Sequence, residues 1–384
     1  MSPASIPPPL PSASLGPTLP VAGPAVTPVT APAAGPACPL APAGTAPEPP
    51  SPYPAPSTAS GPVARSRGGR AADAAGAALV PADLPVVTEM SRTASGRAWL
   101  AELPALIAEF RDRWSLRLGP PIHGGSCSWV APAALPDGGS AVLKLTWPHR
   151  EAAGEAAGLR TWGGNGAVHL LAADERRHAL LVERCVPGTE LGEDGRHSPD
   201  ARLAAAAELL NGLWSAPPPA TGLERLAAVT REWATLVEQR MARLRPDYDP
   251  GLVAIGVDLL RTLPRSATRE VVVHGDFNPG NVLASERRPW LAIDPKPMVG
   301  DPGYDPWPLL TQLDEPFEHD DPAPVLAHRY ALVADAVGED PRRLLAWSVA
   351  RTVESALWFA AMGEVADGAE EMAQAAALAE LAGL

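Results

Sequence analysis

The stretch HGDFNPGNVL at residues 274–283 decides the fold, because it sets a polar loop between two apolar runs. Residues 271–273, all valine, lead into it as a predicted buried strand, and its last residues, Val282 and Leu283, predict a second strand. A Pro-Gly pair inside the loop predicts a turn. The next apolar run, LAIDPK at 291–296, predicts a return strand, so that the polar residues of both segments meet at one end of a small hairpin ribbon.

Three polar side chains are expected to meet at that end of the ribbon: Asp276, Asn281 and Asp294. Carboxylate and amide oxygens are the ligands that Mg²⁺ prefers, usually while it also bridges to phosphates. A lone aspartate in a turn usually forms only an Asx-turn. Here an aspartate, four residues, an asparagine and a further aspartate thirteen residues later match the pattern of phosphoryl-transfer sites. The spacing therefore predicts a metal–phosphate site.

Lysine is almost absent from the chain. Of 31 basic residues, only Lys144 and Lys296 are lysines, and arginine is used everywhere else. A compositional bias toward arginine explains the general rule. The two exceptions indicate positions where a compact ammonium is needed, although chance retention is an equal alternative for either residue alone.

The N-terminal segment has a composition of its own. Residues 1–64 contain one charged residue, Glu48, and 20 of the 47 prolines precede residue 70. Proline removes backbone donors, and large apolar side chains are too scarce to offset the entropy of ordering. We expect residues 1–85 to form a disordered, partly polyproline-II tail rich in proline and alanine. The sequence leaves open whether this tail is a linker, a docking arm or the result of a wrongly assigned start.

The remaining chain predicts an α+β fold with two lobes: a small β-rich N-lobe over residues 86–187 and a larger α-rich C-lobe over residues 188–384. Apolar spacing predicts a helix within 99–116, with Pro104 in its first turn. An Asp-Gly-Gly turn predicts a hairpin before the strand 141–147. Further expected elements are a helix over 151–162, two strands within 167–186, and helices over 199–214, 223–244, 251–263, 325–337, 341–362 and 364–382.

Charge and cysteine usage narrow the partners and the compartment. The net charge of −13 argues against nucleic acid as a partner and favours a cationic small molecule. The three cysteines, Cys38, Cys127 and Cys185, are scattered, which excludes a disulfide framework and suits a reducing cytoplasm. The first residues lack a secretory signal pattern, and no apolar run is long enough to predict a membrane span. We expect a cytoplasmic protein that does not bind membranes.

Eight stretches, in this order, carry a resemblance to a known family: GGSCSWVAP, AVLKLTWPH, EAAGLRTW, GAVHLLA, LLVERCVPG, HGDFNPGNVLA, WLAIDPK and GDPGYDPW. The chain resembles the aminoglycoside phosphotransferase family of the protein-kinase-like fold. It is most similar to the branch of streptomycin 6-kinases and aminoglycoside/hydroxyurea antibiotic resistance kinases. The resemblance covers roughly residues 95–384 and does not include the tail.

The resemblance implies a nucleotide site in the N-lobe. Lys144, on a strand, would hold the α- and β-phosphates of ATP, and Glu155 on the next helix would pair with it. Glu151, one turn earlier, is the competing partner. The segment Gly124, Gly125 and Ser126 would cover the phosphates with backbone N–H groups, although a plain turn is the alternative.

The same resemblance implies a hinge and a catalytic loop. The carbonyl of Glu183 and the amide of Cys185 would bind the adenine edge. Asp276 would orient the acceptor hydroxyl or accept its proton, while Asn281 and Asp294 would hold Mg²⁺. His274 would have a structural role only, fixing the loop by hydrogen bonds.

Several residues after the loop have a less definite role. Lys296 would contact phosphate or acceptor, or form a salt bridge within the loop. Asp301 and Asp305 begin the next helix, and Asp305 is expected mainly to support the catalytic loop. The acidic run LDEPFEHDDP at 313–322 would bind an amine or guanidinium of the acceptor or simply face solvent; its candidate residues are Asp314 and Glu315.

The segment after Lys296 is too short for the activation segment of a protein kinase, which favours a small-molecule acceptor. We therefore expect a monomeric, ATP- and Mg²⁺-dependent O-phosphotransferase that inactivates a cationic antibiotic, with streptomycin-type aminoglycosides as the first choice. Hydroxyurea, a peptide antibiotic, a sugar or an amino alcohol are the alternative acceptors. A nucleotide-binding pseudokinase is the alternative from another class, and the complete set of polar residues argues against it.

Overall fold

The computed structural model describes residues 79–384. Of the tail predicted to be disordered over residues 1–85, residues 1–78 lie outside the described part, and residues 79–85 lie inside it. Leu84 is buried, and the indole nitrogen of Trp129 donates a hydrogen bond to the carbonyl of Leu79 at 2.7 Å. Helix α1 (Pro85–Met90) follows directly. The prediction of disorder was wrong for residues 79–85. It rested on the high proline content, whereas Leu84 packs into the core cluster formed with the sheet.

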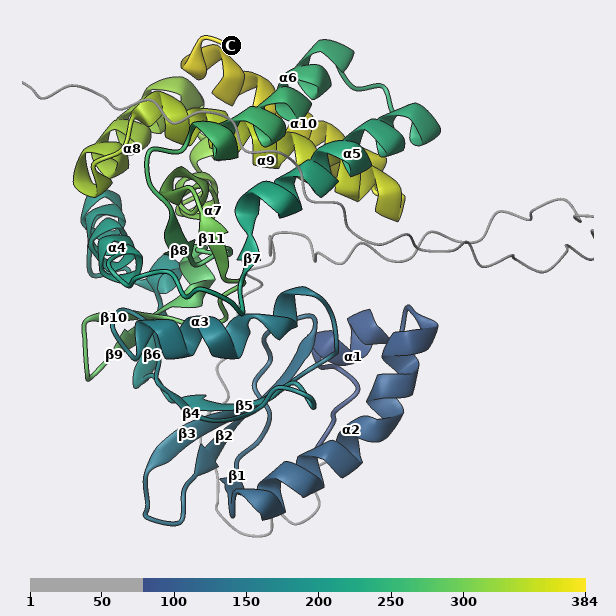
Figure 1. Ribbon diagram of the computed structural model, residues 1–384, viewed down its shortest axis with the longest axis vertical. Helices are drawn as coiled ribbons and strands as arrows, with labels where there is room; N and C mark the ends of the chain where they lie inside the picture. The colour runs from purple at the N-terminus through teal and green to yellow at the C-terminus, as the bar shows by residue number, and fades with distance from the viewer. Residues whose placement is uncertain (1–78) are drawn as a thin grey trace, which may run out of the picture. The chain divides into compact units, whose positions relative to one another are not determined.

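The N-terminal part of the described chain is built on a five-stranded antiparallel sheet with strand order β1-β2-β3-β5-β4 (Figure 1). The register pairs Val130 with Lys144 and Lys144 with Leu180, so that the lysine lies on the central strand. The strands are β1 (Arg117–Leu118), β2 (Ser128–Ala134), β3 (Ser140–Thr146), β4 (Leu170–Asp174) and β5 (Ala179–Glu183).

Helix α2 (Ala94–Arg113) packs against this sheet, and its start differs from the prediction. The hydroxyl of Thr93 accepts a hydrogen bond from the amide of Gly96 at 3.0 Å, which caps the helix ten residues before Pro104. Pro104 is therefore inside the helix and not in its first turn. Phe110, Trp129 and other buried side chains of α1, α2 and the sheet form one core cluster.

The predicted helix over 151–162 is divided into two parts. A 3-10 turn at Glu151–Ala153 precedes helix α3 (Glu155–Trp162). Helix α3 lies between the sheet and the helical part (Figure 1), and its apolar face belongs to the core cluster of that part. Gly158 allows this close approach, because a Cβ there would lie 2.6 Å from the Cγ of Pro297.

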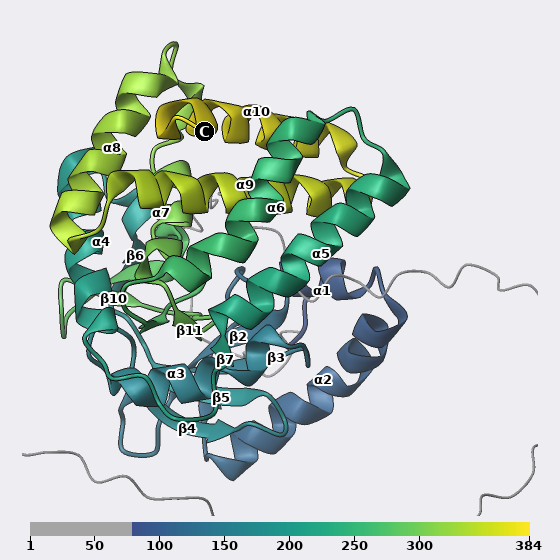
Figure 2. The ribbon, with the colours of Figure 1, turned by 45° about the horizontal axis from the view of Figure 1, so that its top comes forward.

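The C-terminal part is mostly helical, and helix α9 (Pro341–Met362) runs through its centre (Figure 2). Nearly every residue of α9 between Leu344 and Ala360 is buried, because α5, α6, α8 and α10 pack around it. None of the helices in residues 79–384 is long and apolar enough to cross a membrane. The other helices here are α4 (Pro199–Trp214), α5 (Leu226–Leu244), α6 (Pro250–Thr262), α7 (Trp307–Gln312), α8 (Pro322–Val337) and α10 (Val365–Ala382).

Two small sheets position the loop that follows Val273, and their pairing corrects the predicted ribbon. Strand β8 (Val271–Val273) pairs with β11 (Met298–Gly300), which also pairs with β7 (Glu224–Arg225). A separate sheet has the order β10-β9-β6, with β6 (Pro187–Glu190), β9 (Val282–Ser285) and β10 (Trp290–Ala292). The predicted return hairpin is present as β9–β10, but the strand before the loop belongs to a different sheet.

The packing of α1 predicts where the chain can be shortened. Removing residues 1–78 should leave the melting temperature within about 2 °C, because no described contact of the sheet is lost. Removing residues 1–91 deletes three buried side chains, Leu84, Val86 and Met90. At roughly 1.5–3 kcal/mol for each buried side chain, that variant should melt many degrees lower. Calorimetry of the two truncated proteins checks this, and equal melting temperatures would contradict it.

Candidate active site

The loop over residues 274–281 is held in place by Asp305, which is buried at the end of a 3-10 turn. Its carboxylate accepts hydrogen bonds at 2.8 Å from the backbone amides of His274 and Gly275 and from the indole of Trp214. Burial raises the pKa of Asp305 to about 6, although these three donors favour the anion. At neutral pH an ionised Asp305 therefore holds the backbone of the loop.

Gly275 and Lys296 bring the loop against the segment that follows β10. Gly275 has a φ of +87°, and a Cβ there would lie 2.0 Å from the carbonyl oxygen of Lys296. The amide of Lys296 donates to the carbonyl of His274 at 2.8 Å. Burial lowers the pKa of His274 to about 4, so its neutral ring donates through Nε2 to the carbonyl of Ile293 at 3.0 Å. His274 thus has a structural place in the loop.

Asp276 and Asn281 lie next to each other at the loop surface. The side-chain nitrogen of Asn281 donates to the carbonyl of Asp276 at 2.9 Å and to its carboxylate at 3.2 Å. Asn278 shapes the turn between them, because its side-chain oxygen accepts from the amides of Gly280 and Asn281 at 3.0 and 3.1 Å. Sequence reasoning did not single out Asn278, although its place directly before Pro-Gly is a turn signal.

Lys144 connects the N-lobe sheet to this loop region through buried ion pairs. Its ammonium donates to both carboxylate oxygens of Glu155, at 2.7 and 2.8 Å, and also bonds to Asp294. Burial opposes the charge on Lys144, but Asp294 and Glu155 outweigh it and raise its pKa. The structure thus pairs Lys144 with Glu155 and not with the competing Glu151.

Lys296 joins the two aspartates of the loop region. Its ammonium lies 3.2 Å from the carboxylates of both Asp276 and Asp294. Although burial opposes ionisation of Asp294, the two lysines hold the pKa of this carboxyl well below its usual range. Asp294 also has a φ of +51°, an uncommon conformation for a residue with a side chain. Of the two roles considered for Lys296, the structure contains the salt bridge.

The chemistry of Asn281 and Asp294 fits a magnesium ion. The amide of Ile293 donates to the carbonyl of Asn281 at 2.9 Å, which keeps the two ligand candidates close. With the nitrogen of Asn281 bonded to Asp276, its side-chain oxygen is the atom that would bind a cation. Among residues 79–384 no three His, Cys, Asp or Glu side chains are grouped to hold a metal, so phosphates and water would supply the remaining ligands.

Two segments were predicted to contact a nucleotide: residues 124–126 and residues 183–185. Gly124, Gly125 and Ser126 precede β2, and a Cβ at Gly124 would meet nothing within 4 Å. The carboxylate of Glu183 pairs with Arg287 at 2.8 Å, and its backbone amide donates to the carbonyl of His169 at 2.9 Å. Burial raises the pKa of Cys185 to about 12, so its thiol stays protonated.

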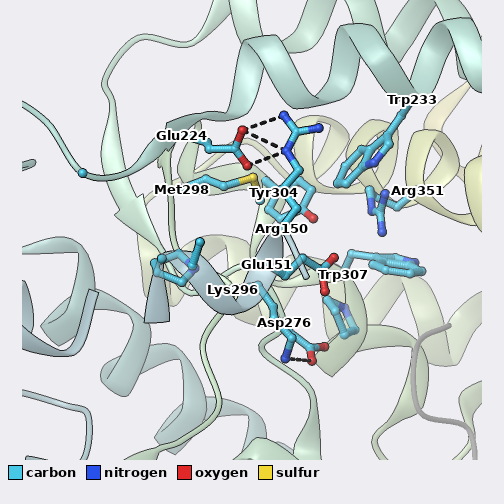
Figure 3. A pocket seen from close by; sticks show the side chains of 16 residues that line it. Arg150, Glu151, Glu224, Trp233, Asp276, Lys296, Met298, Tyr304, Trp307 and Arg351 are labelled. Carbon is cyan, nitrogen blue, oxygen red and sulfur yellow. Dashed lines mark hydrogen bonds and ion pairs between the residues drawn. The ribbon is translucent and has the colours of Figure 1, made fainter. Parts of the chain in front are cut away.

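A cavity of about 340 Å³ opens beside Asp276 and Lys296 (Figure 3). Glu151 lines it, together with side chains from α5, α7 and α9 that sequence reasoning assigned only to helices. The guanidinium of Arg351 lies 4.0 Å from the ring centre of Trp233 and 5.1 Å from that of Trp307. Aromatic and arginine residues on amphipathic helices look like ordinary core in the sequence, so nothing there distinguished them.

Three acidic candidates lie elsewhere. Asp301 is buried and accepts hydrogen bonds from Arg343 at 2.9 Å and from the indole of Trp347 at 2.6 Å. Asp314 forms two bonds with Arg202, at 2.7 and 2.8 Å, and neither it nor Glu315 lines the cavity. The structure does not bring this acidic run to Asp276.

Comparison with known proteins supports a phosphotransferase. The family model "Aminoglycoside/hydroxyurea antibiotic resistance kinase" matches residues 113–363. Streptomycin 6-kinase of Streptomyces glaucescens is 37% identical over 73% of this chain and 89% of its own length. Hydroxyurea phosphotransferase of Kitasatospora aureofaciens is 37% identical over 79% of this chain and 87% of its own length.

Solved structures support the fold. The GDP complex of an aminoglycoside 2'-phosphotransferase-IIIa variant superposes with a TM-score of 0.50 at 17% identity, covering 72% of this chain and 97% of the other. Choline kinase of Cryptosporidium parvum superposes with a TM-score of 0.51 at 11% identity, covering 72% and 95%. The predicted two-lobed fold is confirmed. The chain belongs to the aminoglycoside/hydroxyurea antibiotic resistance kinase family, whose members are phosphotransferases of the protein-kinase-like fold.

Proposed function

We propose that this kinase transfers the γ-phosphate of ATP to a hydroxyl of a cationic aminoglycoside of the streptomycin type. The observation that carries the proposal is the position of Asp276. Its carboxylate lies at the cavity wall and, through Lys296, is joined to Asp294 and Lys144. An acceptor in the cavity would therefore be next to a base and close to the groups suited to phosphate.

Each polar group has a role that follows from its surroundings. Lys144, held by Glu155, supplies a fixed positive charge for the α- and β-phosphates. Asn281 and Asp294 would hold Mg²⁺, which when bound neutralises phosphate charge. Asp276 orients the acceptor hydroxyl and takes its proton, while the ion pair with Lys296 holds the carboxylate of Asp276 in position. Catalysis in this arrangement rests on positioning and electrostatics.

The choice of acceptor rests on the net charge of the protein and on the names of its relatives. Two relatives are named streptomycin 6-kinases, from Streptomyces glaucescens and Streptomyces griseus, and one is named a hydroxyurea phosphotransferase. A protein of net charge −13 attracts a cation more strongly than an uncharged molecule such as hydroxyurea. Hydroxyurea is the second candidate. A monomeric enzyme in the cytoplasm is part of the same proposal.

A mass-gain screen tests the function. Purified protein with ATP and Mg²⁺ is incubated with streptomycin, other aminoglycosides, hydroxyurea and peptide antibiotics. Gain of one phosphoryl group by streptomycin, lost when EDTA is added, is the expected result. Gain by hydroxyurea alone would overturn the choice of acceptor, and no gain on any compound would overturn the proposed activity.

Replacing Asp276 with asparagine should lower kcat by roughly 100- to 10,000-fold, the contribution typical of a positioned base. Asparagine has a similar shape but cannot accept a proton, and Asp276 belongs to the acceptor side of the site. ATP affinity, measured by calorimetry, should therefore stay within about threefold of the parent. Equal transfer rates in variant and parent would contradict the role.

Replacing Glu155 with glutamine should instead lower the efficiency with which the enzyme uses ATP. Loss of one charged partner of Lys144 should lower kcat/KM for ATP by roughly 10- to 100-fold, the value of one charged hydrogen bond, and leave the KM for the acceptor nearly unchanged. Glu175→Gln is the matched control, because its ion pair with Arg160 is exposed, with half of each side chain accessible. An equal effect of the two substitutions would contradict a specific role of Glu155.

A further inference from the structure

We propose that Glu151 binds a cationic group of the acceptor, next to the hydroxyl that Asp276 orients. This inference deepens the proposed function and rests on it, because it names the residue that would select a positively charged substrate. It assigns Glu151 to substrate recognition instead of pairing with Lys144.

The chain brings Glu151 to the cavity by a short route from the ATP side. Strand β3 carries Lys144 and ends at Thr146, and the 3-10 turn at Glu151–Ala153 then presents Glu151 to the cavity. Glu151 and Asp276 both line this cavity (Figure 3). A molecule bound there can therefore contact both carboxyl groups.

The other carboxylates of the cavity wall already have partners. Three described residues of the wall carry carboxyl groups. Glu224 accepts three hydrogen bonds of 2.6–2.9 Å from Arg150, and Asp276 is engaged by Lys296 and Asn281. Glu151 differs from these two because its Oε2 has no hydrogen-bond partner. A cation of the acceptor would therefore displace no hydrogen bond at that oxygen.

Glu151 is buried and one of its oxygens is unsatisfied. Its side chain is 11% exposed, and Oε2 has no hydrogen-bond partner. The Nε2 of His149 lies 3.9 Å from Oε2 of Glu151, and the Nδ1 of the same ring is bonded to the carbonyl of Trp147. Oε2 itself is fully buried, so a ligand in the cavity would first meet the accessible part of the Glu151 side chain. A donor that reached the carboxyl group would offset the cost of its unsatisfied oxygen.

A cationic ligand would change the charge state of Glu151. Burial raises its pKa to about 8, with Lys296 and Arg351 opposing the rise and Asp276 and Asp294 adding to it. The carboxyl is therefore mostly neutral before the acceptor binds. An ammonium or guanidinium at hydrogen-bonding distance would stabilise the ionised form.

The aromatic side of the cavity is less suitable for such a group. The guanidinium of Arg351 lies over the rings of Trp233 and Trp307 and donates to Glu354 at 2.8 Å. A second cation on those rings would be repelled by Arg351. The carboxyl of Glu151 is therefore the lining group that we expect the cation of the acceptor to contact.

The test compares a charged with an uncharged acceptor in the full-length enzyme. Glu151→Gln has nearly the shape and charge of the protonated residue, so its melting temperature should match that of the parent. Its KM for streptomycin should rise by roughly 10- to 100-fold, as expected for loss of a charged hydrogen bond. Its kcat and its KM for ATP should change by less than about threefold, and its KM for hydroxyurea should not rise.

Two further variants control the result. Glu318→Gln removes the same charge from the acidic run outside the cavity, and its KM for streptomycin should equal that of the parent. Glu151→Asp keeps the charge on a shorter side chain, and should recover part of the affinity lost in Glu151→Gln. An equal rise in KM for Glu151→Gln and Glu318→Gln would overturn the inference, because it would show only a general effect of net charge.

Failure of this inference can be told apart from failure of the proposed function. An active parent whose KM for streptomycin is unchanged in Glu151→Gln overturns the role of Glu151 alone. A parent that neither phosphorylates streptomycin nor binds it in calorimetry overturns both. If the parent binds streptomycin without phosphorylating it, the dissociation constants of the parent and of Glu151→Gln are compared instead. A rise of roughly 10- to 100-fold in the variant supports the role of Glu151, and equal constants overturn it.

Discussion

A row of alternating charges, buried at its N-lobe end, is the constraint on which the candidate active site depends. Glu155, Lys144, Asp294, Lys296 and Asp276 follow one another, each in contact with an opposite charge. The row crosses from the N-lobe sheet to the loop that carries Asp276, so it would couple the proposed ATP side to the proposed acceptor side. Removing one member of such a network leaves its neighbour uncompensated, which is why its residues cannot be exchanged singly without cost.

The backbone of the catalytic loop is fixed from beneath by a different set of contacts. Asp305 holds two loop amides, and Gly275 permits a backbone approach that a side chain would block. Apart from the carboxylate of Asp305, these contacts are made by backbone atoms, which take no part in the proposed reaction. The division separates two tasks: hydrogen bonds to the backbone set the position of the loop, while the side chains of Asp276 and Asn281 remain available for chemistry.

The sequence predicted the parts that depend on local pattern. Helix 199–214 was placed to the residue, because Ser198 caps it and Pro199 begins it. The motif around Asp276 and the two lysines led to residues that the structure brings together. Local pattern failed where tertiary contacts decide the structure. It placed Pro104 in the first turn of a helix, whereas the helix begins earlier and Pro104 lies inside it. It also paired the strand before the loop with the wrong sheet, because a strand of three residues carries too little pattern to indicate its partner. The cavity wall comes from segments far apart in the chain, so no spacing could reveal it.

The segment proposed as the hinge has a chemical consequence for inhibition. Many reagents that inactivate enzymes need a thiolate, and the thiol of Cys185 is buried in a setting that keeps it protonated. Burial also raises the pKa of Cys127, near the glycine-rich segment. Oxidants and thiol-directed compounds would therefore react slowly with either cysteine. If the proposed ATP site lies beside them, an inhibitor of that site would have to bind without the help of a reactive thiol.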